Sequence, residues 1–393
     1  MQQKSKAVVF IAMAYPSGGI RHLALLGNEL HKCANGCFDF YVASVCREAD
    51  RGFWAEVKSG GSEEYIIRAE TFAELAKKSV VLAKKYDHLI IHTGGGYGQT
   101  KHFVCAQRNM EPKFATRITL VGTTHSYRHD SWMRVPMSAF QYVLYRVFYR
   151  MIVFQCQYAA DRFVGGNDLI RRGRGMVIPL GCESFPKVTS IPSRTIVDKK
   201  LDGLLGDDHV FKFVYLAGFR PGKMHVWLVH AIAPVLKRHA EARVLFCGMG
   251  NPNVISATEE AVADEGLSDR ILLTGQIPRD EVPWLLQHSN CALVPSRAET
   301  FGHNFLEPMF AGLPVLGTRV GIGRDIIKDR ETGMGFSLED PESLRNAAEY
   351  VLASPANAKQ MGASAKKLVE NQFRHSDVAR HLNRLYCKLF AEN

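Results

Sequence analysis

The sequence predicts an α/β protein of two successive domains, each built on a parallel sheet with helices on both faces. Three observations support this fold class. The 393 residues exceed what one ordinary core accommodates. Short apolar runs alternate with longer amphipathic stretches, as strands and helices do in such sheets. The alternation stops over residues 184–208, which contain Pro186, Pro192 and Gly203, and then starts again.

The first domain is expected over residues 1–190. It begins with a strand that leads through Gly18 and Gly19 into a helix ending near residue 32. A long helix is expected over 138–157. The strands of this domain are expected at 6–14, 38–45, 87–92, 117–122, 161–164 and 175–179.

The second domain is expected over residues 209–374, after a linker at 191–208, and a last helix at 375–393 is expected to pack back on the first domain. Two facing Rossmann-like units would enclose a deep cleft, with the ligand at the carboxyl ends of the strands. Strands are expected at 211–217, 242–246, 270–273, 292–295 and 314–317, and the final helices at 341–353, 356–371 and 375–391.

The composition favours a cytoplasmic globular protein. Apolar residues make up 46% of the chain and charged residues 22%, which is enough apolar surface for real cores and excludes a disordered chain. No apolar run reaches the roughly 18 residues that span a bilayer. The polar start at residues 1–6 is unlike a secretory signal peptide. Scattered cysteines without a His cluster predict no zinc site.

The net charge of +10 is confined to the first half of the chain. Residues 1–190 hold 25 Lys and Arg against 15 Asp and Glu, whereas residues 191–393 hold 24 of each. Nucleic acid, a membrane surface or a phosphate-bearing acceptor would each complement this asymmetry.

The motif with the clearest chemistry lies at residues 299–307, where two carboxylates stand eight positions apart. Glu299 precedes a glycine turn that follows a strand, and Glu307 lies inside the next helix. Glu307 is suited to accept hydrogen bonds from a ribose diol, and Glu299 to face a sugar. Backbone N–H groups at a helix start suit a diphosphate. The residues expected to supply them are Phe301, Gly302, His303 and Asn304.

Residues 294–317 resemble the signature of glycosyltransferase family 4, which comprises retaining enzymes of the GT-B fold. Its pattern is Glu, seven residues, Glu, then an Ala-x-Gly-x-Pro-Val run, and both parts are present. The resemblance implies transfer of a hexose-type sugar from a nucleotide diphosphate sugar to a glycan or lipid-linked acceptor. Surface polysaccharide biosynthesis is the default role in this family. The resemblance also implies that the anomeric configuration is retained and that the reaction uses no metal and no cofactor.

The loop at residues 217–225 resembles the family's Gly-Arg…Lys-Gly loop, whose two cations hold the donor diphosphate. Lys223 matches the lysine, Arg220 is the candidate for the arginine, and Met224 replaces the common glycine. Fixed cations would stabilise the departing diphosphate where other enzymes use Mg²⁺. Three further residues resemble the strand-end and base-contacting positions of the family, namely Gly248, Gly250 and Ile277.

The first domain contributes fewer candidates. Gly18 and Gly19 resemble the family's Gly-Gly loop, which reaches the diphosphate and sugar through a backbone N–H. His125 ends a strand where the family often has His-Asp, and here Ser126 follows it. His92, before three glycines, fits a site histidine and a structural histidine equally well.

Several alternatives stay open at this stage. The aromatic and Arg-rich stretch 132–157 fits a core helix, a helix at a membrane interface or a nucleic-acid contact. The family context favours an anionic membrane on the inner face over nucleic acid, which is not expected as a partner. A nucleotide-sugar epimerase shares the fold and needs no second substrate. A nucleic-acid-binding module would use the basic half.

Overall fold

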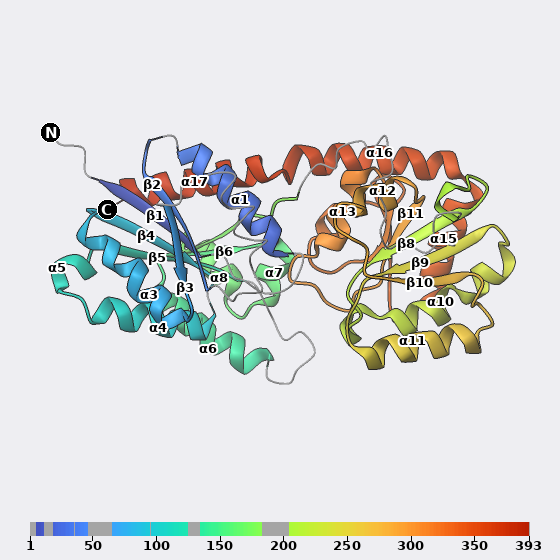
Figure 1. The fold of residues 1–393 in the computed structure, drawn as a ribbon, viewed down its shortest axis with the longest axis horizontal. Helices are drawn as coiled ribbons and strands as arrows, with labels where there is room; N and C mark the ends of the chain where they lie inside the picture. Colours follow the sequence, from blue (N-terminus) through green and yellow to red (C-terminus); the bar gives the residue numbers. More distant parts are fainter. Residues whose placement is uncertain are drawn as a thin grey trace. The chain divides into compact units, whose positions relative to one another are not determined.

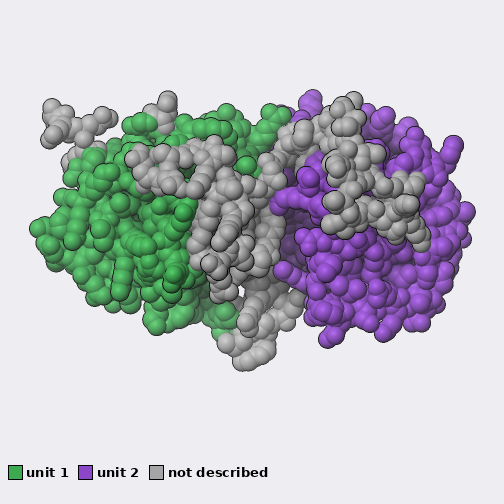
Figure 2. Space-filling view, in the orientation of Figure 1, with its two compact units in different colours: residues 1–181, 373–393 green, residues 182–372 purple. Residues whose placement is uncertain are grey.

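The protein folds as two compact units, shown in separate colours in Figure 2. Unit 1 comprises residues 1–181 and 373–393, and unit 2 comprises residues 182–372. A computed structural model describes residues 5–11, 19–34, 36–45, 65–94, 96–124, 134–182 and 204–392.

Unit 1 is built on a parallel sheet of seven strands among its described residues, in the order β3-β2-β1-β4-β5-β6-β7. Every pairing is parallel, so all carboxyl ends meet at one edge of the sheet. The order reverses direction between the central strands β1 and β4. The strands are β1 Lys6–Ile11, β2 Asp39–Val45, β3 Ile66–Ala69, β4 His88–Thr93, β5 Ile118–Thr123, β6 Met151–Phe154 and β7 Gly175–Val177.

Helices cover both faces of this sheet (Figure 1). On one face, Leu26 and Leu30 of α1 pack with Leu382 and Tyr386 of the C-terminal helix α17. On the other, α3, α4 and α6 bury side chains such as Phe103. The helices are α1 Gly19–Ala34, α3 Phe72–Val81, α4 Tyr97–Arg108, α5 Pro112–Ala115, α6 Arg134–Phe148, α7 Gln157–Arg162, α8 Gly166–Arg171 and α17 His375–Ala391, with a 3₁₀ turn η3 at Leu82–Lys84.

Unit 2 repeats the architecture with six parallel strands in its described part, in the order β10-β9-β8-β11-β12-β13. Here the order reverses between β8 and β11. The strands are β8 Phe211–Leu216, β9 Ala242–Cys247, β10 Ile271–Gly275, β11 Cys291–Val294, β12 Val315–Thr318 and β13 Gly333–Phe336.

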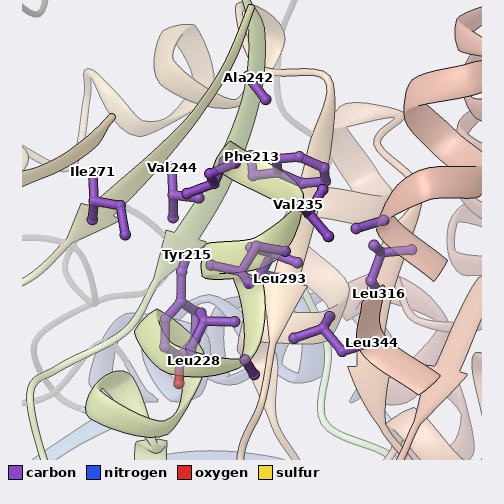
Figure 3. Close-up of a cluster of buried hydrophobic side chains, with 14 of the residues drawn as sticks. Phe213, Tyr215, Leu228, Val235, Ala242, Val244, Ile271, Leu293, Leu316 and Leu344 are labelled. Carbon is purple, nitrogen blue, oxygen red and sulfur yellow. The ribbon is translucent and has the colours of Figure 1, made fainter. Parts of the chain in front are cut away.

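The main core of unit 2 lies between its sheet and helices α10 and α15 (Figure 3). Phe213, Val244 and Leu293 point from the strands toward Val235 of α10 and Leu344 of α15. The helices are α10 His225–Arg238, α11 Pro252–Asp264, α12 Val282–Gln287, α13 His303–Ala311, α14 Gly323–Ile326, α15 Pro341–Ala353 and α16 Pro355–Gln372, with a 3₁₀ turn η4 at Pro221–Lys223.

The predicted fold class is confirmed, because both units are parallel α/β sheets. The cleft between the domains stays a prediction. Residues 191–203 of the expected linker at 191–208 lie outside the described part. The end of that stretch belongs to unit 2, since Leu205 is buried there and its carbonyl accepts a hydrogen bond from Lys212. No described helix combines the length and apolarity needed to cross a membrane.

Two predictions about residues 138–164 are wrong. The long helix ends at Phe148, and residues 151–154 form the buried strand β6 between β5 and β7. The strand expected at 161–164 is replaced by the end of helix α7, at Arg162, and the turn that follows it. A short apolar run fits a buried strand or a buried helix equally well, and only the pairing with neighbouring strands decides between them.

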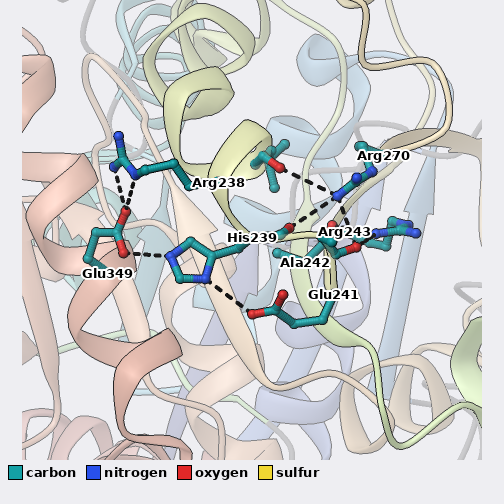
Figure 4. A network of polar contacts seen from close by, with 9 residues as sticks. Arg238, His239, Glu241, Ala242, Arg243, Arg270 and Glu349 are labelled. Atoms are coloured by element: carbon teal, nitrogen blue, oxygen red, sulfur yellow. Dashed lines mark hydrogen bonds and ion pairs between the residues drawn. The ribbon is translucent and has the colours of Figure 1, made fainter.

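A polar network fastens α10 to α15 at the amino-terminal edge of the unit 2 sheet (Figure 4). His239 bridges Glu349, at 2.7 Å, and Glu241, at 3.1 Å, and Arg238 also pairs with Glu349. Burial lowers the pKa of His239, but hydrogen bonds and charge from the two glutamates outweigh it, so the pKa is raised.

This raised pKa predicts a pH-dependent stability of unit 2. The protonated form of His239 is favoured in the folded state, so its contribution is fully present below the unfolded pKa. It is lost as pH rises through the folded value. The free energy of unfolding, measured in urea from about pH 6 to about pH 9, should fall more steeply in the wild type than in His239→Gln. His209→Gln, at an exposed position, is the matched control. Equal slopes in all three proteins would contradict the assignment.

Candidate functional site

The candidate site of unit 2 lies where the strand order reverses, at the carboxyl ends of β8 and β11. Loops leaving two adjacent parallel strands in opposite directions create a crevice there, which is the usual ligand position in open α/β sheets. Both loops carry residues predicted from the sequence, Lys223 after β8 and Glu299 after β11. The topology therefore brings together two motifs that lie far apart in the chain.

An ion pair joins the two loops. The Lys223 ammonium donates to Oε1 of Glu299, and both side chains are mostly buried. Ser296, which is fully buried, donates to the same carboxylate oxygen at 2.7 Å. The Tyr215 hydroxyl donates to the Lys223 carbonyl at 2.8 Å. These contacts fix both charged groups in position, which is a requirement for an electrostatic role.

An uncharged histidine lies two residues after Lys223. His225 is buried and stacks on Phe219, with the ring centroids 4.1 Å apart. Neither ring nitrogen has a hydrogen-bond partner among the described residues. Burial, and then the charge of Lys223, lowers the pKa of His225 to about 4. The imidazole is therefore uncharged at neutral pH and adds no competing positive charge beside Lys223.

The loops after β8 and β9 run against one another at the backbone. The Phe219 N–H donates to the Met249 carbonyl at 3.1 Å, and the Asn251 N–H donates to the Phe219 carbonyl at 2.8 Å. A Cβ on Gly248 would lie 2.2 Å from the Ala217 carbonyl oxygen, and one on Gly250 would lie 2.3 Å from that of Phe219. Packing against the first loop therefore accounts for both glycines.

The second carboxylate, Glu307, lies in helix α13, whose first turn is formed by the predicted diphosphate residues. Gly302 precedes the helix with φ +100°, and His303 and Asn304 begin it. The Asn304 amide is buried, and neither polar atom has a hydrogen-bond partner in the described part of the chain. Burial raises the pKa of Glu307, although the charges of His303 and Arg279 act in the opposite direction.

A glycine outside the predicted motifs supports the loop that carries Glu299. Gly321 has φ +55°, and a Cβ there would lie 2.3 Å from the Phe301 carbonyl oxygen and 2.7 Å from the Glu299 Cβ. That carbonyl accepts a hydrogen bond from the Ile322 N–H at 2.7 Å. The loop after β12 thus presses directly on the loop after β11.

The other predicted residues divide between the units. In unit 2, Arg220 is exposed and has no ion-pair partner among the described residues, and Ile277 follows β10. In unit 1, Gly19 begins α1, whereas Gly18 and His125 lie outside the described residues. His92, the weaker candidate, is buried and contacts Tyr386 of α17 and Thr123, each at 2.6 Å.

Four residues of the site were missed by the sequence analysis: Tyr215, His225, Ser296 and Gly321. Tyr215 and His225 contact residues of their own segment after β8, and Ser296 contacts Glu299 within the loop after β11, but these contacts correspond to no sequence motif. Gly321 follows β12 and precedes Gly323, and this glycine pair at a strand end was the only available signal. No cluster of three or more metal-ligating side chains occurs in the described residues, and the absence of a metal cofactor stays a prediction.

Comparisons with known proteins find a family match within unit 2. Residues 200–368 match the family described as glycosyl transferases group 1, which confirms the family predicted from residues 294–317. The chain is 29% identical over 173 residues to N-acetyl-alpha-D-glucosaminyl L-malate synthase of Bacillus anthracis, covering 44% of each chain. It is 29% identical over 168 residues to the lipopolysaccharide core biosynthesis mannosyltransferase LpcC of Rhizobium leguminosarum bv. viciae, covering 42% of this chain and 47% of LpcC. The match thus spans less than half of each relative.

The whole fold is similar to that of Anabaena Alr3699/HepE, solved in complex with UDP and glucose. The TM-score is 0.73 at 17% identity, over 97% of this chain and 99% of that protein. At this identity the likeness establishes the fold alone. It confirms the predicted GT-B class.

The contact at Gly321 predicts an effect on stability that backbone strain alone does not produce. Gly266 also has a positive φ, +68°, but a Cβ added there would meet no other atom. Gly266→Ala should therefore cost only about 1–2 kcal/mol for the left-handed conformation. Gly321→Ala should lower the free energy of unfolding of unit 2 by a larger amount, because its methyl group meets backbone. Urea denaturation of both variants measures the difference, and equal losses would rule out the steric contact.

Proposed function

Because residues 200–368 belong to the glycosyl transferases group 1 family, we propose that the chain is a glycosyltransferase that uses a nucleotide diphosphate sugar. The observation that carries this proposal is the joint position of the Lys223–Glu299 pair and the start of α13 at one sheet edge. A donor there would meet fixed positive charge, the N-terminus of a helix and two carboxylates. The HepE complex with UDP and glucose, on the same fold, supports this class of donor.

The diphosphate would bind between the first turn of α13 and the cations after β8. The N-terminus of a helix favours anions because its first N–H groups have no partner within the helix. Arg220 and Lys223 add full charges. The buried Asn304 amide, which lacks partners among the described residues, would gain one from the nucleotide. Glu307, one turn further along the helix, would accept from the ribose hydroxyls.

The reaction breaks the bond between the sugar C1 and the diphosphate oxygen. Negative charge develops on the departing nucleotide diphosphate, and Arg220 and Lys223 would stabilise it without a metal. The acceptor hydroxyl would attack C1 from the face of the leaving group and pass its proton to the departing diphosphate oxygen. The anomeric configuration is then retained. Glu299 would face the hexose-type sugar, held by Ser296 and Lys223.

We propose a glycan or lipid-linked acceptor, as in surface polysaccharide biosynthesis. The similarity to LpcC, named for lipopolysaccharide core biosynthesis, supports this role. The excess of basic residues in the first half supports an anionic acceptor or an anionic membrane surface on the cytoplasmic side. An epimerase of the same fold is the alternative, and incubation with the donor alone would distinguish it because an epimerase needs no acceptor.

The role of Glu307 predicts weaker nucleotide binding in Glu307→Ala. Losing a charge-assisted hydrogen bond to the ribose should cost about 1.5–3 kcal/mol of binding free energy. Titration calorimetry with UDP and with GDP identifies the nucleotide and measures the loss. The control is Glu331→Ala, at an exposed carboxylate of the same unit. Unchanged affinity in Glu307→Ala would refute the ribose contact.

The chemistry of the leaving group predicts metal-independent transfer with retention. Activity toward a glycan acceptor should survive EDTA, because Arg220 and Lys223 supply the positive charge at the diphosphate. NMR of the product should show the anomeric configuration of the donor. Activity that EDTA abolishes and Mg²⁺ or Mn²⁺ restores would overturn the first part, and an inverted linkage would overturn the second.

A further inference from the structure

Helix α6 of unit 1 presents an apolar face to solvent. Met137, Phe140, Val143 and Val147 are 41 to 64% exposed and recur at helical spacing. The opposite face is also apolar, since Tyr145 and the following Tyr149 are buried against the sheet. A helix on the surface of a domain normally turns charged and polar residues outward. The outward face of α6 therefore has the composition of a surface that a binding partner covers when the protein functions.

Helix α4 extends this face. The ring of Tyr97, which is 52% exposed, lies 5.4 Å from that of Phe140, and the Arg108 guanidinium lies 5.8 Å from the ring of Phe148. The two helices thus lie side by side, as Figure 1 also shows. Among the described residues, five of the nine exposed large hydrophobic side chains belong to α4 and α6. We call these exposed surfaces the α4–α6 face.

The charges on the α4–α6 face have one sign. Neither helix sequence contains Asp or Glu, and Lys101, Arg108 and Arg146 are exposed on them. Two acids near these helices, both in the described part of the chain, are engaged with other groups. Glu111 pairs with Lys113, and Asp168 pairs with Arg172 and accepts from Tyr142 of α6. Exposed apolar side chains are therefore combined with cations and without acids.

We propose that the α4–α6 face docks on an anionic lipid bilayer, with the apolar side chains entering the headgroup region and the cations meeting lipid phosphates. Helices that lie on membranes combine an apolar ridge with flanking Lys and Arg in this way. A second copy of this chain would bring the same positive charge against the face, which disfavours self-association. The inference deepens the proposed function by assigning its membrane partner to one surface, and it needs neither nucleotide nor transfer to be tested.

Sedimentation with vesicles tests the proposal. The wild-type protein should pellet with phosphatidylcholine vesicles that contain phosphatidylglycerol, less with phosphatidylcholine alone, and less at high salt. Val143→Ser with Val147→Ser should reduce pelleting at both salt concentrations. Arg108→Gln with Arg146→Gln should reduce binding at low salt by at least tenfold, since each basic residue near an anionic surface contributes about fivefold.

Matched controls separate docking from folding and from overall charge. Val164→Ser with Val177→Ser makes the same change at two exposed valines outside α4 and α6, and Arg380→Gln with Arg384→Gln removes two arginines from α17 on the opposite face of the sheet. Thermal unfolding verifies that each variant is folded. Unaltered binding by the controls supports the proposal. The proposal is overturned if test and control variants lose binding equally, or if the wild-type protein binds neutral and anionic vesicles equally or binds neither. Self-association through this face would also overturn it.

Discussion

The ion pair between Lys223 and Glu299 is the contact on which the candidate site depends. It links two loops, and its two residues are 76 positions apart in the chain. They meet because β8 and β11 are neighbours at the centre of the sheet. Ser296 fixes the carboxylate, and Tyr215 fixes the backbone of the lysine. Separating the pair would leave a largely buried charge without its counter-ion, so the two loops hold one relative position.

Backbone contacts between loops complete the same edge. Gly248 and Gly250 let the loop after β9 lie against the loop after β8, and Gly321 lets the loop after β12 lie against Phe301. Met224 shows the reverse situation. It adopts φ +60°, a conformation that glycine takes without strain, and it occupies the position where the family commonly has glycine. The sequence difference thus leaves the turn intact at the cost of some local strain.

The share of the structure that can be predicted from the sequence differs between the two units. Five of the six strands in the described part of unit 2 and the Glu299–Glu307 motif could be predicted from local patterns, because each lies in one continuous stretch, whereas β13 at Gly333–Phe336 was not predicted. The ion pair between Lys223 and Glu299 could not be predicted in this way, because it depends on β8 and β11 being neighbours in the sheet. In unit 1, the sequence predicts helix for the segment Met151–Phe154, which forms strand β6, because four apolar residues carry no period that distinguishes helix from strand. The packing role of Gly321 depends on the neighbouring Phe301 backbone, which the glycine pair at that strand end does not indicate.

Helix α17 has a consequence for the order in which the protein is made. Its side chains Leu382, Tyr386 and Phe390 complete the core on one face of the unit 1 sheet, yet they are translated after the whole of unit 2. The first 181 residues therefore leave the ribosome with one sheet face only partly covered and must wait for unit 2 to be synthesised. Unit 2 is continuous in sequence and has no such delay. The domain that begins the chain is thus the one that finishes folding last.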